Sequence, residues 1–416
     1  MTRPAGSSKT AKVPTAKTSA ATSGDSEKPT PAVLAAGYET VALVLQGGGA
    51  LGAYQCGVYE GMHAAGLRPD WFAGISIGAV NAALIAGNPP EQRVARLREF
   101  WELICDPGGS LAWPAAAIRS MLAWLPESAE RSAWAGGLSA MAALLQGQRG
   151  FYDARATSPF LFEDGSPSAT SFYDTAPLQA TLERLIDFDR INDDKTIRLT
   201  VGATCVRNGN FVYFDSNDTR IGPLHVLASA ALPPGFAPVS IDGELYWDGG
   251  LVSNTPLEYV LNAQPRRDTL ALQVDLWSAR GPLPKTMTDV LERIKDIQYS
   301  SRTRHGTDTV ARLQRLRSAL NLLIAKLPDG ALDADLQSAL DPWLSDRVFN
   351  VIHLIYQAKP HEEQFKDYAF GQLAMREHWA SGERDMAATL RRPGYFSPPD
   401  RDVGFATHDL HRPTRS

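Results

Sequence analysis

Ser76 stands in the sequence Gly74-Ile75-Ser76-Ile77-Gly78, between an apolar run typical of a strand and one typical of a helix. A serine on such a sharp turn projects its hydroxyl above the sheet, and the two flanking glycines let strand and helix approach closely. The start of the helix adds free N–H groups and a partial positive charge beside the hydroxyl. The motif predicts a nucleophilic serine, although five residues of this kind also occur by chance.

A glycine-rich loop, residues 47–52, follows the preceding strand-like run, one strand–helix unit before Ser76. Adjacent parallel strands end side by side, so the glycine N–H groups can point at an oxyanion formed when Ser76 attacks a carbonyl. The same letters match the dinucleotide-binding pattern G-x-G-x-x-G. That pattern requires an acidic residue at the end of the next strand, whereas here Asp70 precedes the strand and Ser76 ends it. We therefore favour an oxyanion hole over a dinucleotide site.

Asp248, followed by Gly249 and Gly250, comes directly after the strand-like residues 239–247. An aspartate at the C-terminal end of a strand lies at the same sheet edge as Ser76, and the glycines leave room around it. Asp248 is therefore a candidate base for the serine. From these three residues alone, a simple Asp-Gly turn is the more frequent explanation.

A histidine base is the alternative for a serine hydrolase. Some hydrolases use Ser, Asp and His in that chain order, and His353 lies in a downstream strand-like run. A histidine between Ile352 and Leu354 is more often a core or edge residue than a base. None of the other histidines has the spacing of a metal ligand. The sequence therefore favours Asp248 over His353 as the partner of Ser76.

Strands that alternate with helices must position these residues. We expect strands at residues 40–45, 71–75, 196–206, 211–214, 239–247, 269–277 and 347–356. We expect helices at residues 50–65, 78–86, 91–104, 178–186, 224–230, 286–327 and 371–390. The pair Asn208-Gly209 indicates a hairpin. This alternation predicts an α/β fold with a mostly parallel sheet that helices cover on both faces.

The composition is that of an ordinary globular protein: 416 residues, 44% apolar, 21% charged, with a net charge of −5. The mild acidity argues against a nucleic-acid partner, which requires clustered Lys and Arg. The three cysteines are far apart and odd in number, so we expect reduced, packed thiols. No run reaches the ~20 apolar residues that span a bilayer. These features favour a cytoplasmic location and allow peripheral contact with a membrane.

Composition along the chain divides it into four parts. Residues 1–37 contain too few apolar side chains to pack, so we expect a disordered tail. A catalytic region follows at 38–280, in which the Trp-containing residues 113–150 are a candidate lid or helical insertion. Residues 281–392 predict a mainly helical C-terminal region, and residues 393–416 a loose tail.

Four motifs together resemble the patatin-like phospholipase family. Residues 47–58 resemble its oxyanion-loop motif and residues 74–78 its nucleophile motif. Residues 248–250 resemble its aspartate motif, and residues 229–239 the stretch that precedes it. All four occur in family order and cover roughly residues 40–275. Residues 296–304 and 378–382 resemble an uncharacterised C-terminal domain of some bacterial patatin-like proteins.

The resemblance implies a three-layer α/β/α fold and a serine acyl hydrolase that needs no metal or cofactor. Ser76 would be the nucleophile of a Ser–Asp dyad and Asp248 its base, with an acyl-enzyme intermediate. The residues implied as oxyanion donors are Gly47, Gly48 and Gly49, and the supporting glycines are Gly52, Gly74, Gly78, Gly249 and Gly250. Because an ordinary aspartate is a weak base at neutral pH, we expect burial to raise the pKa of Asp248.

The implied substrates are lipid carboxyl esters: phospholipids, lysophospholipids or glycerides. No residue chooses among them, and another acyl ester such as a storage polyester presents the same carbonyl. A catalytically silent lipid-binding or scaffold module is the non-enzymatic alternative. A strained serine has no physical purpose in such a module, so the sequence favours an enzyme.

Overall fold

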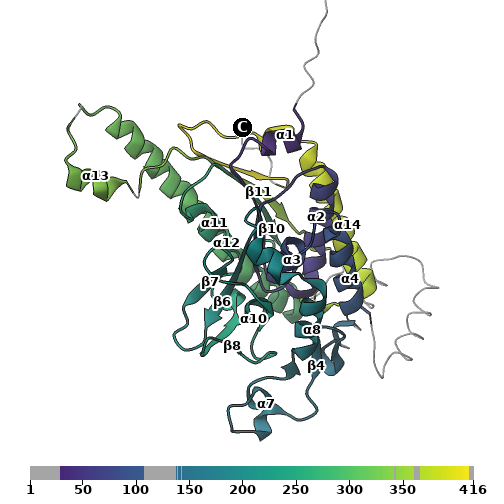
Figure 1. Ribbon diagram of the computed structural model, residues 1–416. Helices are drawn as coiled ribbons and strands as arrows, with labels where there is room; N and C mark the ends of the chain where they lie inside the picture. The colour runs from purple at the N-terminus through teal and green to yellow at the C-terminus, as the bar shows by residue number, and fades with distance from the viewer. Residues whose placement is uncertain are drawn as a thin grey trace, which may run out of the picture.

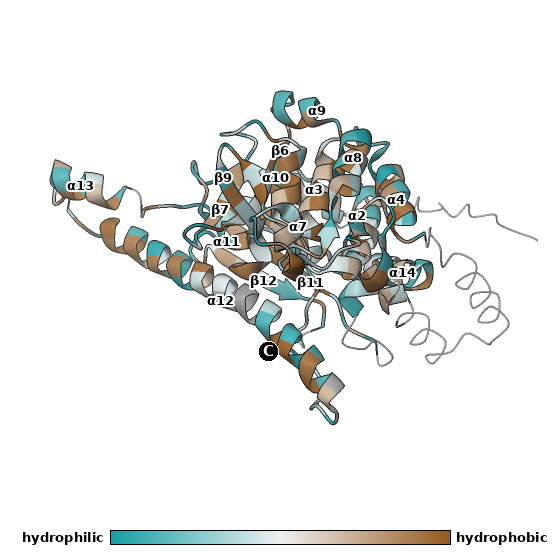
Figure 2. Ribbon diagram, turned by 90° about the horizontal axis from the view of Figure 1, so that it is seen from below, coloured by the Kyte–Doolittle hydropathy of each residue, from teal (hydrophilic) through white to brown (hydrophobic). Residues whose placement is uncertain are grey.

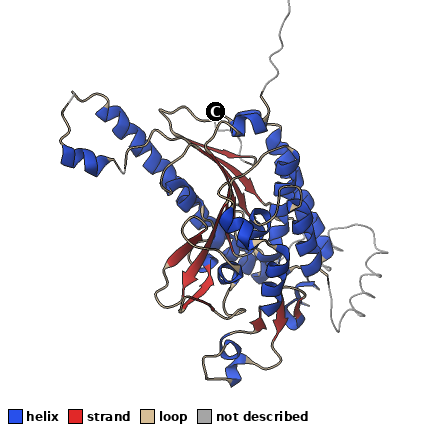
Figure 3. Cartoon of the chain, in the orientation of Figure 1, coloured by secondary structure: helices blue, strands red, loops and turns tan. Residues whose placement is uncertain are grey.

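The computed structural model describes residues 29–106, 137, 139–141, 143–328, 330–341, 343–359 and 366–411. At its centre is a nine-stranded, mostly parallel sheet, which confirms the predicted fold class (Figures 1 and 3). In order across the sheet, the parallel strands are β12 (Phe405–Asp409), β11 (Phe349–Ile355), β10 (Thr269–Asp275), β1 (Thr40–Leu45), β2 (Trp71–Ile75) and β6 (Arg198–Cys205). The antiparallel strands at the β6 edge are β7 (Phe211–Asp215), β9 (Glu244–Asp248) and β8 (Val239–Ile241).

Both faces of the sheet are buried, as a parallel sheet requires. On β1, Leu43 and Leu45 pack into the larger core, whereas Ala42 and Val44 pack into a second core on the opposite face. The helices that line the larger core are α2 (Ala53–Ala64), α3 (Ile77–Ala86), α4 (Arg93–Ile104), α8 (Ala176–Leu185), α9 (Phe188–Asp193), α10 (Pro223–Ala230) and α14 (Gln372–Leu390). The second core is formed with α11 (Leu257–Asn262) and α12 (Met287–Ile324). The result is the expected three-layer α/β/α arrangement.

Short elements surround the sheet. A small antiparallel sheet contains β3 (Gly147–Gln148), β4 (Tyr152–Ala154) and β5 (Tyr173–Asp174). The remaining elements are α1 (Pro31–Ala35), η1 (Gly49–Gly52), η2 (Pro159–Leu161), α7 (Pro167–Thr170), η3 (Gly249–Leu251), α13 (Ala334–Leu340), η4 (Lys366–Tyr368) and η5 (Pro393–Phe396). The far end of α12 and the helix α13 project away from the sheet (Figures 1 and 2). In the described part of the chain, no helix combines the length and apolar character needed to cross a bilayer.

The C-terminal region is built into the same sheet as the catalytic region. It supplies β11 and also β12, which lies within the stretch that we expected to be a loose tail. Its helix α14 packs along α2 at two glycines: a Cβ at Gly57 would meet the carbonyl of Trp379, and one at Gly382 the carbonyl of Tyr54. This close packing makes the two regions one structural body.

The predicted N-terminal tail and one predicted strand also differ from the structure. Within the expected tail, Pro31–Ala35 forms α1 and Ala35 is buried, while residues 1–28 lie outside the described residues. The single strand expected at 239–247 is wrong, because the chain turns at Asp242 and Gly243, whose φ angles are 50° and 84°. Two successive positive φ angles are typical of a tight hairpin, and an Asp-Gly pair supplies them easily.

Candidate active site

Ser76 lies at the sharp turn between β2 and α3, as the sequence predicts. Its φ and ψ of 55° and −128° place it in a region that non-glycine residues rarely adopt. The Ser76 N–H donates to the Oγ of Ser229 at 3.1 Å, and this hydroxyl donates to the Gly202 carbonyl at 2.6 Å. The Ser76 carbonyl accepts the N–H of Ala79 at 2.9 Å. These contacts fix the strained conformation that presents the Ser76 hydroxyl.

Glycines around the turn allow backbone to pack on backbone. A Cβ at Gly74 would meet the carbonyl of Gly78, and a Cβ at Gly78 would meet the carbonyl of Leu45. A Cβ at Gly52 would lie 2.7 Å from the Cγ1 of Ile77. The three glycines therefore let β1, β2 and α3 converge at Ser76.

Asp248 reaches Ser76 by a different route from the one that the sequence suggested. Its strand β9 is antiparallel to β6 and enters the sheet from beyond the C-terminal edge. Asp248 pairs with Ala203 of β6, one residue past Gly202, which itself pairs with Ile75. A Cβ at Gly249 would lie 2.7 Å from the carbonyl of Gly202. This glycine contact lets the Asp248 turn lean across β6 toward the end of β2.

Asp248 is only 1% exposed. Burial raises its pKa to about 7, while the hydroxyl of Ser76 and the N–H of Gly250, as hydrogen-bond donors, oppose the rise. The Gly250 N–H lies 2.7 Å from the Oδ1. The side chains of Ser76 and Asp248 thus meet, and the carboxylate is poised to accept a proton near neutral pH.

The three glycines expected as oxyanion donors differ in the hydrogen bonding of their N–H groups. The N–H of Gly47 donates to the carbonyl of Asn254 at 3.3 Å. The N–H groups of Gly48 and Gly49, at the start of η1, have no acceptor within the described residues, as is usual for the first N–H groups of a helix. The carbonyl of Gly47 accepts from the Nδ2 of Asn254 at 3.0 Å and the Nε1 of Trp277 at 2.9 Å.

Ser76, Asp248 and the loop glycines share one cavity of about 290 Å³. Its remaining wall is largely aromatic and aliphatic. These wall residues are Ile77, Leu144, Phe151, Tyr152, Phe172, Tyr173, Ala230, Leu232, Pro233, Pro234, Gly235, Phe236, Gly250, Asn254, Trp277, Tyr299, Asp367, Tyr368 and Phe370. An apolar cavity with a few convergent polar groups is typical of a binding site for a largely apolar ligand.

Several cavity residues were not predicted from the sequence. Asn254 follows the Asp-Gly-Gly motif by only a few residues, and its position in that polar loop was the available signal. Asp367, Tyr368 and Phe370 come from the C-terminal region, more than 100 residues beyond Asp248, and nothing in their local sequence indicates a cavity. Only their place in the fold brings them to the site.

His353 lies away from Ser76. It is on β11, which β10 and β1 separate from β2, and strands spaced ~4.8 Å apart place it roughly 14 Å across the sheet. Its Nδ1 lies 3.5 Å from the Oδ2 of Asp275. The structure therefore does not bring His353 to the serine.

Two other expectations concern the region around the cavity. The candidate lid at 113–150 lies largely outside the described residues, although Leu144 lines the cavity. Among the described residues, no group of three or more His, Cys, Asp or Glu side chains could hold a metal ion. The three cysteines Cys56, Cys105 and Cys205 are free and buried.

Comparisons with known proteins give two family matches and two similar solved structures. A family model described as patatin-like phospholipase matches residues 43–261, and a second, described as patatin phospholipase, matches residues 297–402. VipD from Legionella pneumophila is 14% identical with a TM-score of 0.36, over 85% of this chain and 67% of VipD. ExoU from Pseudomonas aeruginosa, solved with SpcU, is 16% identical with a TM-score of 0.25, over 73% of this chain and 67% of ExoU. No curated protein matches.

The first model alone spans more than half of the 416 residues and includes the serine, the glycine-rich loop and the aspartate. Members of this family are typically serine hydrolases, and membership implies lipid acyl hydrolase activity. The chain belongs to the patatin-like phospholipase family.

Proposed function

We propose that this protein hydrolyses lipid carboxyl esters with Ser76 as nucleophile and Asp248 as base. The observation that carries the proposal is the meeting of the Ser76 hydroxyl with a buried carboxylate whose pKa is raised to about 7. An aspartate with an ordinary pKa would be a poor base for a serine hydroxyl, whereas one that titrates near neutral pH can take and return the proton.

In the acylation step, the Oγ of Ser76 attacks the ester carbonyl while Asp248 accepts the hydroxyl proton. The N–H groups of Gly48 and Gly49 stabilise the negative oxygen of the tetrahedral intermediate, and one such donor is worth ~3 kcal/mol. The protonated Asp248 then gives its proton to the leaving alkoxide as the C–O bond breaks. The products are an alcohol and an acyl ester of Ser76.

In the deacylation step, Asp248 takes a proton from a water molecule, which attacks the acyl carbonyl from the side of the departed alcohol. The tetrahedral intermediate collapses, the Ser76 oxygen regains the proton from Asp248, and the carboxylic acid leaves. The buried carboxylate therefore acts as base and then as acid in each half of the cycle.

The cavity supports a lipid rather than a small polar ester as the substrate. Aromatic side chains such as Phe151, Tyr152 and Phe236 pack together along its wall, with ring centroids 5.3–6.3 Å apart. Each buried methylene of an acyl chain contributes ~0.8 kcal/mol to binding in such surroundings. Phospholipids, lysophospholipids and glycerides all meet this requirement, and the proposal covers the three.

The test compares Ser76→Ala, Asp248→Asn and His353→Ala with wild type on p-nitrophenyl esters of increasing chain length. We expect the first two variants to lose at least about 10³-fold in kcat while remaining folded by circular dichroism. His353→Ala is the matched control and should retain kcat within about twofold. Unchanged turnover by Ser76→Ala would overturn the proposal.

A further inference from the structure

The short helix η4 of the C-terminal region packs directly on the oxyanion loop. Gly49 has a φ of 55°, and a Cβ there would meet the carbonyl oxygen of Asp367. Asp367 and Tyr368 also line the cavity that holds Ser76. A segment from the C-terminal region therefore touches the glycine that carries one of the two oxyanion donors.

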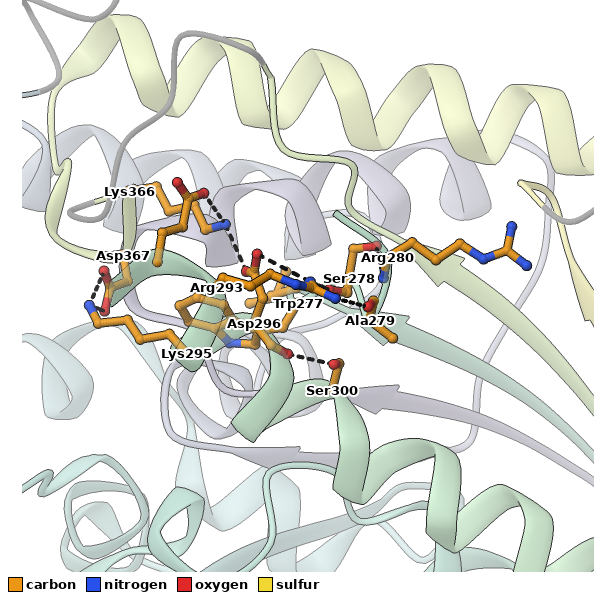
Figure 4. Close-up of polar contacts among 12 residues, drawn as sticks. Trp277, Ser278, Ala279, Arg280, Arg293, Lys295, Asp296, Ser300, Lys366 and Asp367 are labelled. Atoms are coloured by element: carbon orange, nitrogen blue, oxygen red, sulfur yellow. Dashed lines mark hydrogen bonds and ion pairs between the residues drawn. The ribbon is translucent and has the colours of Figure 1, made fainter. Parts of the chain in front are cut away.

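Two sets of ion pairs attach η4 to α12 (Figure 4). In one set η4 supplies the carboxylate, and in the other it supplies the lysine. The Nζ of Lys295 lies 2.9 Å from both carboxylate oxygens of Asp367. The Nζ of Lys366 lies 2.9 Å from the Oε1 of Glu292 and 2.9 Å from the Oδ1 of Asp296. Consecutive residues of η4 thus carry opposite charges, and each meets its opposite on the same helix.

The partners on α12 share one helix face. Glu292, Lys295 and Asp296 follow the i, i+3, i+4 spacing that places side chains side by side on a helix. The Lys366 side chain is 3% exposed, so the solvent hardly screens its charge. Burial alone would lower the pKa of Lys366, but the carboxylates of Asp296 and Glu292 outweigh it and raise that pKa, so the lysine stays charged.

The same face of α12 also contacts the residue that hydrogen-bonds to the oxyanion loop, Trp277. Tyr299, one turn after Lys295, packs on the ring of Trp277 with centroids 4.9 Å apart. The Nε1 of Trp277 donates to the carbonyl of Gly47, and the Nζ of Lys366 lies 5.4 Å from the Trp277 ring. Trp277 and η4 therefore both contact the loop, and α12 contacts both of them.

The N-terminal half of α12 is itself fixed to the end of β10. Arg293 donates to the carbonyl of Ala279 at 2.5 Å and to that of Ser278 at 3.4 Å (Figure 4). These carbonyls follow Trp277 in the chain. Because α12 is fixed to the end of β10 in this way, its ion pairs hold η4 in place relative to the sheet that carries Ser76. The position of the loop is thereby set relative to the nucleophile.

We propose that Lys295, Lys366 and Asp367 are positioning residues that hold η4 against Gly49 and thereby place the oxyanion donors. This inference rests on the proposed function. A glycine-rich loop has little conformational preference of its own and needs outside support to keep its N–H groups aligned. A misplacement of about 1 Å can cost ~10²-fold in rate. The C-terminal region thus completes the catalytic apparatus instead of serving as an appendage.

The test uses the full-length protein with Lys295→Met, Asp367→Asn, the double variant and Lys295→Arg. We expect each neutral variant to lose ~10–100-fold in kcat with KM within about threefold, because the donors act mainly in the transition state. A trifluoromethyl ketone inhibitor, whose adduct with Ser76 bears an oxyanion, should bind ~10–100-fold more weakly. The double variant should lose no more kcat than the less active of the two single variants, because both changes break the same ion pair. Lys295→Arg should retain most activity.

Lys359→Met is the matched control. Its Nζ lies 2.7 Å from the Oε2 of Glu377 in the same C-terminal region, with similar exposure, and Lys359 does not line the cavity. It should leave kcat and inhibitor affinity unchanged. Wild-type kcat and inhibitor affinity in folded Lys295→Met and Asp367→Asn would overturn the inference. Ser76→Ala, assayed in parallel, must be inactive if the proposed function holds, so the two failures are distinguishable.

Discussion

The Ser76 turn and the contact between η4 and α12 both shape the site, but different physical means hold them. The turn is made by five consecutive residues, whose glycines let backbone touch backbone. The η4 contact joins residues 72 positions apart through charged side chains. Local backbone geometry leaves a pattern in the sequence, whereas an ion pair between distant residues does not. The Ser76 turn can therefore be predicted from the sequence, whereas the contact between η4 and α12 becomes apparent only in the folded structure.

The largest effect should come from Gly74→Ala, which tests the backbone half of this comparison. The new Cβ would meet the carbonyl of Gly78, and neither strand nor helix can move aside without shifting Ser76. Overpacking of this kind costs about 1–3 kcal/mol of unfolding free energy. We expect kcat to fall at least about 10³-fold, measured with a p-nitrophenyl ester alongside a thermal melt.

Gly394→Ala is its control, because a Cβ there would meet no heavy atom within 4 Å. This variant should match wild type in both measurements. If Gly74→Ala kept normal kcat, the close approach of backbone at the Ser76 turn would be irrelevant to catalysis.

The boundaries of the elements around Ser76 agree with the sequence prediction. The strands at 40–45 and 71–75 have the predicted bounds, because their buried apolar runs end at glycine or serine turns. Asp248 was predicted at the correct sheet edge for an incomplete reason: β9 is antiparallel, and only its register with Ala203 brings the carboxylate to Ser76. Register between distant strands is set by tertiary packing, so a single sequence does not reveal it.

The parts that escaped prediction depend on long-range contacts. The strand Phe405–Asp409 has little apolar alternation and forms only where β11 offers it an edge. Asp367, which lines the cavity, pairs with Lys295, and the N–H of Gly47 donates to the carbonyl of Asn254. In each case, the partner that decides the outcome is far away in the chain.

The second prediction concerns pH and tests whether Asp248 is as strongly desolvated as the geometry indicates. Its pKa is raised from 3.8 to about 7, so the folded state holds this proton more tightly than the unfolded state. Its contribution to stability is fully present below about pH 4 and is lost as the pH rises through about 7. At ~1.4 kcal/mol per pH unit, a rise of about 3 units corresponds to a loss of about 4 kcal/mol.

Asp248→Asn should lack this loss and unfold at a higher urea concentration than wild type above pH 7, although it is inactive. The kcat/KM of wild type should rise with pH through about 7, since the base must be ionised to act. Equal urea midpoints for the two proteins from pH 4 to 8 would show that the carboxylate is not desolvated in the native state.

The smallest effect should come from Gly306→Ala, which asks whether α12 acts through its side chains or through its backbone. Gly306 lies inside α12, and a Cβ there would meet no other heavy atom within 4 Å, in contrast to the glycines at the Ser76 turn. Alanine is more favourable than glycine inside a helix by up to ~1 kcal/mol, so urea denaturation should show a gain of about that size. The kcat should not change, because the ion pairs to η4 lie in the N-terminal half of the helix. A fall in kcat with the gain in stability would mean that α12 bends during turnover, and η4 would then be held by a moving helix rather than by a fixed one.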